Sequence, residues 1–324
     1  MSQYWAPTAS LENLRARAEM LATIRTYFAE QTVLEVDTPS LSSSANTDLN
    51  IDSIGAHYQG PSASADGALY LHTSPEFPMK RLLASGCGAI YQICKVFRDG
   101  ECGRYHNPEF SLLEWYRPNF DQHALMADVD ELINLVLGSS TTTLRKLTYQ
   151  QAFIGQVGFD PLTAETTTLQ HCAQQHGINV VGLEGAANDE WLDLLMDQVV
   201  IPSLGDGRVF IYDYPASQAS LARLDPNDNR FAQRFELYIN GIELANGFHE
   251  LTDASLQRQR FENDNIKRQY ASKPTMPIDE NFIAALEAGL PDCAGVALGL
   301  DRLLMLKVGA SNIAQVLAFP FNKA

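Results

Sequence analysis

Residues 96–116 constrain the fold more than any other part of the chain. They spell VFRDGECGRYHNPEFSLLEWY, the end of an apolar strand, a polar glycine-bearing loop and a second strand. In the second strand the pattern has a period of two, so Phe110, Leu112, Glu114 and Tyr116 fall on one face. An aromatic ring, a carboxylate and a phenol on one strand face make a poor hydrophobic core. The pattern therefore predicts a binding pocket on two neighbouring strands.

The loop between these strands adds polar and basic side chains to the predicted pocket. Arg98 ends the first strand, and His106 and Asn107 lie near the end of the loop. A guanidinium presents a planar fork of donors to phosphate oxygens, so Arg98 favours a phosphate-bearing ligand. The flat ring of Phe110 suits a base, and the carboxylate of Glu114 suits an ammonium group.

Composition narrows the class of protein. The 324 residues, 45% of them hydrophobic, can bury a sizeable core. No stretch approaches the roughly 20 apolar residues that span a bilayer, and the N-terminus lacks signal-peptide features. Five cysteines without a C-x-x-C pair argue against a disulfide framework or a zinc site, so we expect a cytoplasmic protein. The net charge of −16 argues against broad nucleic-acid binding.

The N-terminal segments predict a helix with a following strand, and then a strand with a following helix. Residues 10–31 form the first helix, capped by Ser10, and VLEVDTP follows as a strand ending at Pro39. Residues 69–83 predict a short strand, a turn at Ser74, and a helix that starts near Pro75. The helix has an apolar stripe, which comprises Leu11, Leu14, Ala18, Leu21 and Phe28.

A helical insertion is expected over residues 139–203, after a helix at 121–137 that Gly138 ends. Its helices are predicted at 147–156, 167–176 and 189–200. His171, Cys172 and His176 lie within two turns, but without a further ligand ordinary packing is the better interpretation.

Residues 231–248 predict a strand that places acidic side chains at its end. Phe235, Leu237 and Glu243 alternate onto one face, and Glu250 follows seven residues after Glu243. Buried carboxylates cost free energy without partners. Mg²⁺ bridging phosphates is a natural partner, and two solvated acids at a strand end are the alternative.

Residues 295–307 predict a glycine-punctuated strand that runs into a helix near Asp301. Arg302 then adds its charge to the positive end of the helix dipole, which is unfavourable unless an anion binds there.

Together these segments resemble the class II aminoacyl-tRNA synthetases, specifically their lysyl branch. Motif 1 is similar to the first helix with the strand ending at Pro39, and motif 2 matches FR with RYHNPEF and the acidic-aromatic strand. Motif 3 matches GLDR, and the family string ELxNGFxEL is similar to ELANGFHEL. The resemblance covers about 300 residues. It implies an α+β fold, a mostly antiparallel sheet flanked by helices. It also implies one catalytic domain over 1–324 with the insertion at 139–203, and a homodimer built on motif 1.

The resemblance also implies cofactors and site residues. ATP and Mg²⁺ would be the cofactors, with Arg98 on the α-phosphate, Arg302 on the γ-phosphate, and Glu243 and Glu250 as metal ligands. The expected ATP-binding residues are Arg98, Asp99, Gly100, Glu101, His106, Asn107, Phe110, Glu243, Leu244, Gly299 and Arg302. The expected lysine-binding residues are Ser74, Pro75, Glu76, Glu114, Tyr116, Asn246, Glu250 and Ala297.

The acceptor of the activated amino acid is predicted to be a protein. Motif 1 begins near residue 10 and motif 3 ends about fifteen residues before the C-terminus, so we expect no anticodon-binding domain. LLEWYRP, YPASQASLA and GIELANGFHELTDA resemble a stand-alone lysyl branch. Its members transfer (R)-β-lysine to a lysine side chain of translation elongation factor P. We therefore expect adenylation of (R)-β-lysine or lysine and transfer to that factor.

Three alternatives and some departures from the family pattern remain. The alternatives are a free-standing enzyme acting on tRNA, an amide-forming enzyme for acidic amino acids, and a non-catalytic binding subunit. Motif 2 of the tRNA enzymes has a glutamate where this chain has Gly100, which puts that contact to adenine in doubt. Glu101 and a backbone carbonyl of the loop are the two alternatives for it. Ser74 and Ala297 stand where lysyl-tRNA synthetases generally have alanine and glycine. These two differences are either neutral drift or an adaptation of the pocket to β-lysine.

Overall fold

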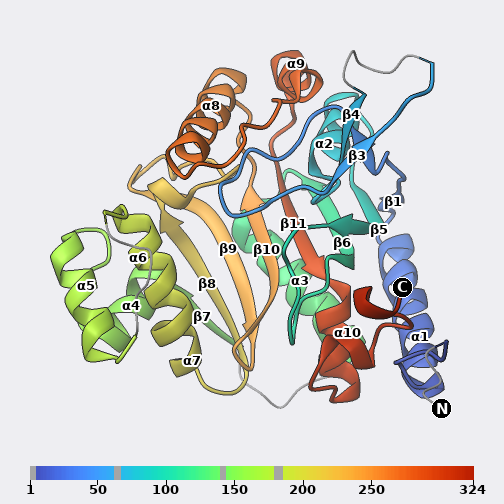
Figure 1. Cartoon of the computed structure of the whole chain (residues 1–324), viewed down its shortest axis with the longest axis horizontal. Helices are drawn as coiled ribbons and strands as arrows, with labels where there is room; N and C mark the ends of the chain where they lie inside the picture. The colour runs from blue at the N-terminus through green and yellow to red at the C-terminus, as the bar shows by residue number, and fades with distance from the viewer. Residues whose placement is uncertain (1–4, 62–66, 139–143, 179–184) are drawn as a thin grey trace. The chain divides into compact units, whose positions relative to one another are not determined.

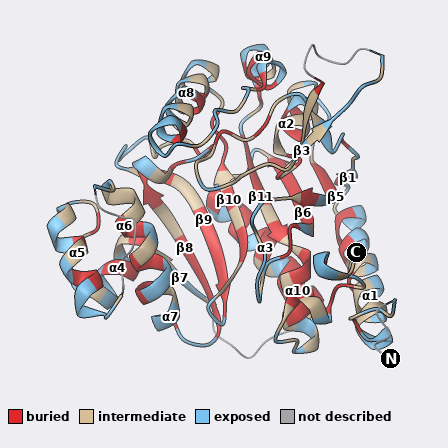
Figure 2. Cartoon of the chain, viewed as in Figure 1, coloured by how far each residue is buried: buried red, intermediate tan, exposed pale blue. Residues whose placement is uncertain are grey.

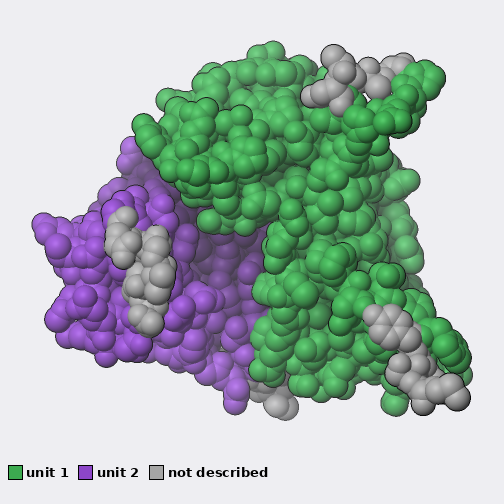
Figure 3. All heavy atoms as spheres, in the orientation of Figure 1, with its two compact units in different colours: residues 1–139, 252–324 green, residues 140–251 purple. Residues whose placement is uncertain are grey.

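The computed structural model describes residues 5–61, 67–138, 144–178 and 185–324 (Figure 1). The fold is α+β, as the sequence predicts, and the chain divides into two compact units (Figure 3). Unit 1 comprises residues 1–139 with 252–324, and unit 2 comprises residues 140–251. Within the described ranges, no helix combines the length and the apolar character needed to cross a membrane.

Unit 1 contains a mixed set of strands in the order β1-β5-β6-β11. β1 runs parallel to β5, whereas β6 is antiparallel to both β5 and β11. A smaller antiparallel sheet has the order β2-β4-β3. The bounds are β1 Leu34–Glu35, β2 Leu41–Ser42, β3 Gly55–His57, β4 Ala68–Leu71, β5 Ile90–Phe97, β6 Glu109–Pro118 and β11 Cys293–Gly299.

The helices of unit 1 are α1 Leu11–Glu30, α2 Glu76–Ala84, α3 Gln122–Leu137, α8 Ala254–Tyr270, α9 Glu280–Gly289 and α10 Leu300–Val308. The predicted cap is confirmed, because the Ser10 side chain accepts a hydrogen bond from the Asn13 N–H. α8 and α9 were not predicted, although Asp253 and Asp279 before them cap their first turns in the same way.

The apolar stripe of α1 is only partly buried within the chain, with Phe28 buried and Leu14 and Leu21 partly exposed. α1 buries Met20, Ile24, Tyr27 and Phe28, whereas Leu11 is 63% exposed. The buried face includes Tyr27, whose hydroxyl donates a hydrogen bond to Asp128 of α3. Buried residues lie along β6 and β11 and on the helix faces that pack on them (Figure 2).

Unit 2 has the strand order β10-β9-β8-β7, with β7 parallel to β8 and the other pairs antiparallel. The bounds are β7 Leu144–Thr148, α4 Tyr149–Val157, α5 Thr166–Gln175, α6 Asn188–Leu195, a π-helix Met196–Val200, α7 Ile201–Ser203, β8 Arg208–Pro215, β9 Phe231–Ile239 and β10 Ile242–His249. The predicted helical segments are confirmed, but β7 precedes them as a strand. Phe153, Leu169 and Trp191 form a core with Ile211 of β8.

Residues 231–248 form a hairpin, so the predicted single strand is wrong. Asn240 and Gly241 have φ of 52° and 74° and make the two-residue turn between β9 and β10. Asn-Gly is the strongest short hairpin signal, because both turn positions require positive φ. The turn places Glu243 opposite Tyr238, on the face away from Phe235.

Asp128 of α3 joins three elements of unit 1 inside the core. Its carboxylate accepts hydrogen bonds from the Tyr27 hydroxyl of α1 (2.5 Å) and the Trp115 indole of β6 (3.0 Å). It also pairs with the Arg117 guanidinium at 2.8 and 3.1 Å, and both charged residues are buried. Four donors on one buried carboxylate hold α1 and α3 against β6.

We expect Asp128→Ala to lower the free energy of unfolding by about 3–5 kcal/mol, because Arg117 would keep a buried charge without its partner. Tyr27→Phe, which removes one donor, should cost about 1 kcal/mol. Urea melts measure both. Asp228→Asn, at the exposed ion pair with Arg230, is the matched control and should change little. A midpoint for Asp128→Ala equal to that of the control would contradict this role.

Candidate functional site

The register of β6 against its two neighbours arranges the predicted pocket residues in rows. Glu114 stands opposite Gln92 of β5 and Ala297 of β11, and Phe110 stands opposite Val96. The pairing is continuous, so Phe110 and Glu114 lie on one strand face, as predicted, roughly 13 Å apart along the strand. A ligand with a flat ring at one end and a cationic group at the other could follow this row.

Glu114 is almost fully buried, with 2% of its surface exposed. Its two carboxylate oxygens accept hydrogen bonds from the hydroxyls of Ser74 and Tyr116, each at 2.6 Å. Burial, and then the nearby charge of Glu76, raise the pKa of Glu114 to about 7. The carboxylate is therefore poorly compensated and would be stabilised by a cation.

The turn before α2 brings Ser74, Pro75 and Glu76 to this carboxylate. The Ser74 hydroxyl oxygen accepts the Glu76 N–H at 3.1 Å, and Pro75 is the residue before the first helical turn. One turn later Lys80, whose side chain is fully buried, donates to Glu76 at 2.5 Å. The start of α2 thus holds Glu76 near Glu114, and Lys80 partly neutralises the charge of Glu76.

Arg98 and Phe110 meet where β5 ends and β6 begins. The Arg98 guanidinium carbon lies 5.1 Å from the centre of the Phe110 ring, and its Nη1 lies 3.5 Å from Glu101. Gly100 has φ of 77°, a conformation that a glutamate side chain would strain. Gly100 also donates its N–H to the Asp99 carboxylate at 2.9 Å. The tight turn explains glycine at this position and directs Glu101 toward Arg98.

α10 supplies the second arginine of this end of the pocket. Gly299 precedes the helix, and Arg302 in its first turn donates to His106 Nε2 at 2.7 Å. Burial and the Arg302 charge lower the pKa of His106, which keeps the imidazole neutral and able to accept this bond. Asn107 uses its amide within the chain, donating to the Glu109 carbonyl and accepting the Phe321 N–H.

Asp301 fixes the position of Arg302, a role that sequence reasoning did not assign. Its carboxylate is 1% exposed, accepts the Ser111 N–H of β6 at 2.7 Å and pairs with Arg17 of α1. The acid directly before the motif 3 arginine therefore joins the start of α10 to the start of β6.

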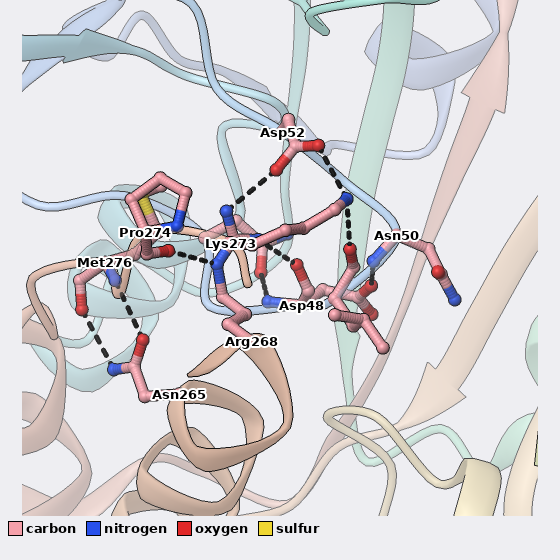
Figure 4. Close-up of polar contacts among 10 residues, drawn as sticks. Asp48, Asn50, Asp52, Asn265, Arg268, Lys273, Pro274 and Met276 are labelled. Atoms are coloured by element: carbon pink, nitrogen blue, oxygen red, sulfur yellow. Dashed lines mark hydrogen bonds and ion pairs between the residues drawn. The ribbon is translucent and has the colours of Figure 1, made fainter. Parts of the chain in front are cut away.

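A buried arginine anchors the loop that contains Asp48 and Asp52 (Figure 4). Arg268 of α8, fully buried, donates to the Asp48 carbonyl at 2.7 Å and to the Asp52 carboxylate at 2.8 Å. Lys273 donates to the other Asp52 oxygen at 2.8 Å. The Asp52 carbonyl in turn accepts the Asp99 N–H at 2.8 Å. Sequence reasoning did not find this cluster, because its members are distant in the chain.

Unit 2 contains the remaining predicted site residues, Glu243, Leu244, Asn246 and Glu250, on or directly after β10. A register shift between Glu243 and Ala245 makes a bulge at Leu244, so Glu243 and Asn246 share one face. Alternation from Asn246 brings Glu250, which is 1% exposed, to that face as well. Unit 1 contains all the other predicted site residues.

The donor set on β10 fits a hard cation. Within the described residues, no group of three or more His, Cys, Asp or Glu side chains that could hold a metal ion is formed. Glu243 and Glu250 lie seven residues apart along β10, roughly 20 Å at the rise of an extended strand, so a single Mg²⁺ could contact only one of them. Glu243 alone fits Mg²⁺, because that ion usually takes one or two carboxylates and completes its shell with water and phosphate oxygens.

Comparison with known proteins gives a consistent result. Residues 5–323 match the family model described as tRNA synthetases class II (D, K and N). Relatives from Edwardsiella ictaluri and Vibrio parahaemolyticus are 50% and 51% identical over 99% of this chain, and over 98% and 99% of their own lengths. A relative from Salmonella gallinarum is 49% identical over 99% of the chain and 98% of its own length. Each is named elongation factor P--(R)-beta-lysine ligase.

The raised pKa of Glu114 predicts a pH-dependent effect of Glu114→Gln on stability. An acid whose pKa rises from 4.5 to about 7 on folding opposes folding progressively as pH rises through that window. The melting temperature of the variant minus that of the wild type should therefore increase from pH 5 to pH 7 and then level off. Ser74→Ala, which removes a donor to the charged form, should extend the wild-type trend to higher pH. A difference that is constant between pH 5 and 8 would contradict this assignment.

Proposed function

The chain belongs to the class II tRNA synthetases, and from that premise we propose that it is an ATP-dependent ligase that attaches (R)-β-lysine or lysine to a lysine side chain of elongation factor P. The names of relatives about 50% identical over almost the whole chain support the reaction and the acceptor. The match to residues 5–323 supports the proposal that both units belong to one catalytic domain.

The observation that carries the proposal is the row on β6. Arg98 and Phe110 stand at one end, suited to a phosphate and a base, and Glu114 stands further along, suited to an ammonium group. A lysyl substrate has a carboxylate to join to ATP and a distal ammonium group. Glu76 adds a second acid for the other amino group. An acidic amino acid would meet repulsion from both carboxylates, which argues against the amide-forming alternative.

In the first step the substrate carboxylate attacks the α-phosphorus of ATP, and pyrophosphate leaves. The chain needs no nucleophile of its own for this step, so its residues act by alignment and by charge stabilisation. Arg98 would bind the α-phosphate and Arg302 the γ-phosphate. His106 accepts a hydrogen bond from Arg302 and so orients it. Mg²⁺ held by Glu243 would neutralise phosphate charge, whereas Glu250 lies too far along the strand to bind the same ion.

In the second step the ε-amine of the acceptor lysine attacks the carbonyl carbon of the adenylate. AMP leaves with the electrons of the broken anhydride bond, the amine loses a proton, and an amide forms. Ser74, Tyr116 and Glu114 hold the distal ammonium throughout. Ala297 stands opposite Glu114 on β11, so its methyl group limits the space beside the amino acid.

We expect a homodimer and a cytoplasmic enzyme. α1 and the short strands after it expose apolar side chains, among them Leu11 (63%), Leu34 (54%) and Leu41 (48%), which supports a dimer surface on motif 1. Sedimentation equilibrium at micromolar concentration should report twice the chain mass of 35.8 kDa. A stable monomer under these conditions would refute the dimer and leave the ligase proposal intact.

The activity is tested by ATP–pyrophosphate exchange with α-lysine and with (R)-β-lysine, followed by mass spectrometry of elongation factor P. We expect exchange with a lysyl substrate and addition of one lysyl group to the factor. Arg302→Ala, which removes one phosphate ligand, should slow exchange by about 10²–10³-fold. Lysine-dependent charging of tRNA without modification of the factor would favour the free-standing tRNA enzyme. No exchange with either isomer would favour a non-catalytic subunit.

A further inference from the structure

The end of α8 brings two basic side chains together. The Lys273 N–H donates to the Arg268 carbonyl at 2.8 Å, and the Ser272 N–H donates to the Gln269 carbonyl at 3.0 Å. Ser272 has φ of 57°, the left-handed conformation that this kind of helix end requires. The turn therefore places Lys273 beside Arg268, and the proposed reaction uses neither residue.

Both cations hold the segment between β2 and β3 (Figure 4). Arg268 donates to the Asp48 carbonyl at 2.7 Å and to one Asp52 carboxylate oxygen at 2.8 Å. Lys273 donates to the Leu49 carbonyl and to the other Asp52 oxygen, each at 2.8 Å. The segment is therefore fixed at two backbone carbonyls and at one side chain.

Asp52 also contacts the loop of motif 2. While its carboxylate binds the two cations, its carbonyl oxygen accepts the Asp99 N–H at 2.8 Å. Asp99 directly follows Arg98, and its own carboxylate accepts the Gly100 N–H where the chain turns toward Glu101. The backbone of Asp52 thus determines where this turn starts.

The cluster around Asp52 is rigid because its central cation is buried. The Arg268 side chain is 0% exposed, whereas those of Asp52 and Lys273 are 35% and 37% exposed. The third guanidinium nitrogen of Arg268, Nε, donates to the Pro274 carbonyl at 2.7 Å, so all three nitrogens are used. Burial alone would raise the pKa of Asp52, but the bonds from Lys273 and Arg268 outweigh burial and lower that pKa. The carboxylate is therefore ionised and pairs with both cations.

Order at the start of the motif 2 loop bears directly on ATP binding. The expected ATP-binding residues include four consecutive positions at this turn, Arg98, Asp99, Gly100 and Glu101. A loop that is ordered before its ligand arrives loses less conformational entropy on binding, so it binds the ligand more tightly.

We propose that Asp52 is a positioning residue for ATP, which Arg268 and Lys273 hold so that its carbonyl fixes the start of the motif 2 loop through the Asp99 N–H. This inference rests on the proposed function and deepens it, because Asp52 acts on the nucleotide only through the backbone of a neighbouring segment. The alternative is a cluster that stabilises the fold and leaves ATP affinity unchanged.

The test compares ATP affinity in Asp52→Asn with that of the wild type. The carboxamide keeps the size of the side chain but turns an NH₂ group toward one of the two cations. We expect the Kd for ATP, measured by calorimetry without lysyl substrate, to rise about 5-fold or more, the cost of ordering one or two loop groups on binding. In pyrophosphate exchange the KM for ATP should rise by a similar factor, while the KM for the lysyl substrate stays within about twofold of the wild type.

Lys273 allows a graded version of this test. Lys273→Met removes one partner of Asp52 and leaves the Arg268 pair, so we expect a smaller rise in the Kd for ATP, about 2–3-fold. Lys273→Arg keeps a cation at this position and should restore the wild-type Kd. Should Asp52→Asn fail to fold, these two variants decide the inference, because Arg268 keeps its charged partner in both.

Glu280→Gln is the matched control. It makes the same change of carboxylate to carboxamide opposite another arginine of α8, Arg258. That pair joins α8 to α9 and does not involve the segment between β2 and β3. The Kd for ATP should therefore stay within about twofold of the wild type, and the melting temperature should change little.

Two outcomes overturn the inference alone. One is a wild-type Kd for ATP in folded Asp52→Asn, whatever its melting temperature, which would leave the cluster as a stabilising contact only. The other is an equal rise in the KM values for ATP and for the lysyl substrate, which indicates general damage to the site. A wild type that binds ATP but shows no lysine-dependent exchange would overturn the proposed function, and the ATP affinities of the variants would still decide the role of Asp52.

Discussion

The pairing of β6 with β5 on one side and β11 on the other is the constraint on which the unit 1 site depends. A slip of one residue would turn every β6 side chain to the opposite face and remove Glu114 from the row with Gln92 and Ala297. Asp301 opposes such a slip, because its carboxylate accepts the Ser111 N–H while it pairs with another helix. Motifs that lie about 190 residues apart in the sequence are thus placed at adjacent strand ends.

Buried acids in unit 1 differ in how completely their charge is compensated, and this separates structural from binding carboxylates. Asp128 is paired with the Arg117 guanidinium, so its charge is neutralised within the fold. The hydrogen bonds to Glu114 come from the neutral hydroxyls of Ser74 and Tyr116, and its pKa rises to about 7. A bound cation would stabilise the ionised form of such a carboxylate. Glu114 is therefore suited to bind a ligand, whereas Asp128 is suited to hold helices.

Local patterns predicted the elements whose signals lie within a few residues. The period of two over β6, the proline at the start of α2 and the arginine after β11 each led to an element that the structure contains. The period-two pattern over residues 231–248 gave a wrong prediction, because it was followed through Asn240–Gly241 as if the chain were one strand. Asn-Gly is a hairpin signal, and the chain reverses there. The apolar pattern of α1 also gives no sign of its bond from Tyr27 to Asp128, because that contact joins two different helices.

The contacts that no pattern predicted are long-range ones. Arg268 with Asp52, and Asp301 with Ser111, join segments about 200 residues apart, and nothing in the composition of either segment points to the other.

The net charge of −16 and a polyanionic nucleotide are compatible because they act over different distances. At physiological ionic strength charges are screened over about 8 Å, so distant acids contribute little at phosphates for which we propose Arg98 and Arg302 as ligands. Arg302 is held by His106, and Arg98 by Phe110 and Glu101, so these guanidinium groups are ordered before a ligand arrives. A long nucleic acid would instead lie along much of the acidic surface and meet repulsion at many points. The same composition therefore permits a nucleotide in a pocket and disfavours an extended polyanion as acceptor.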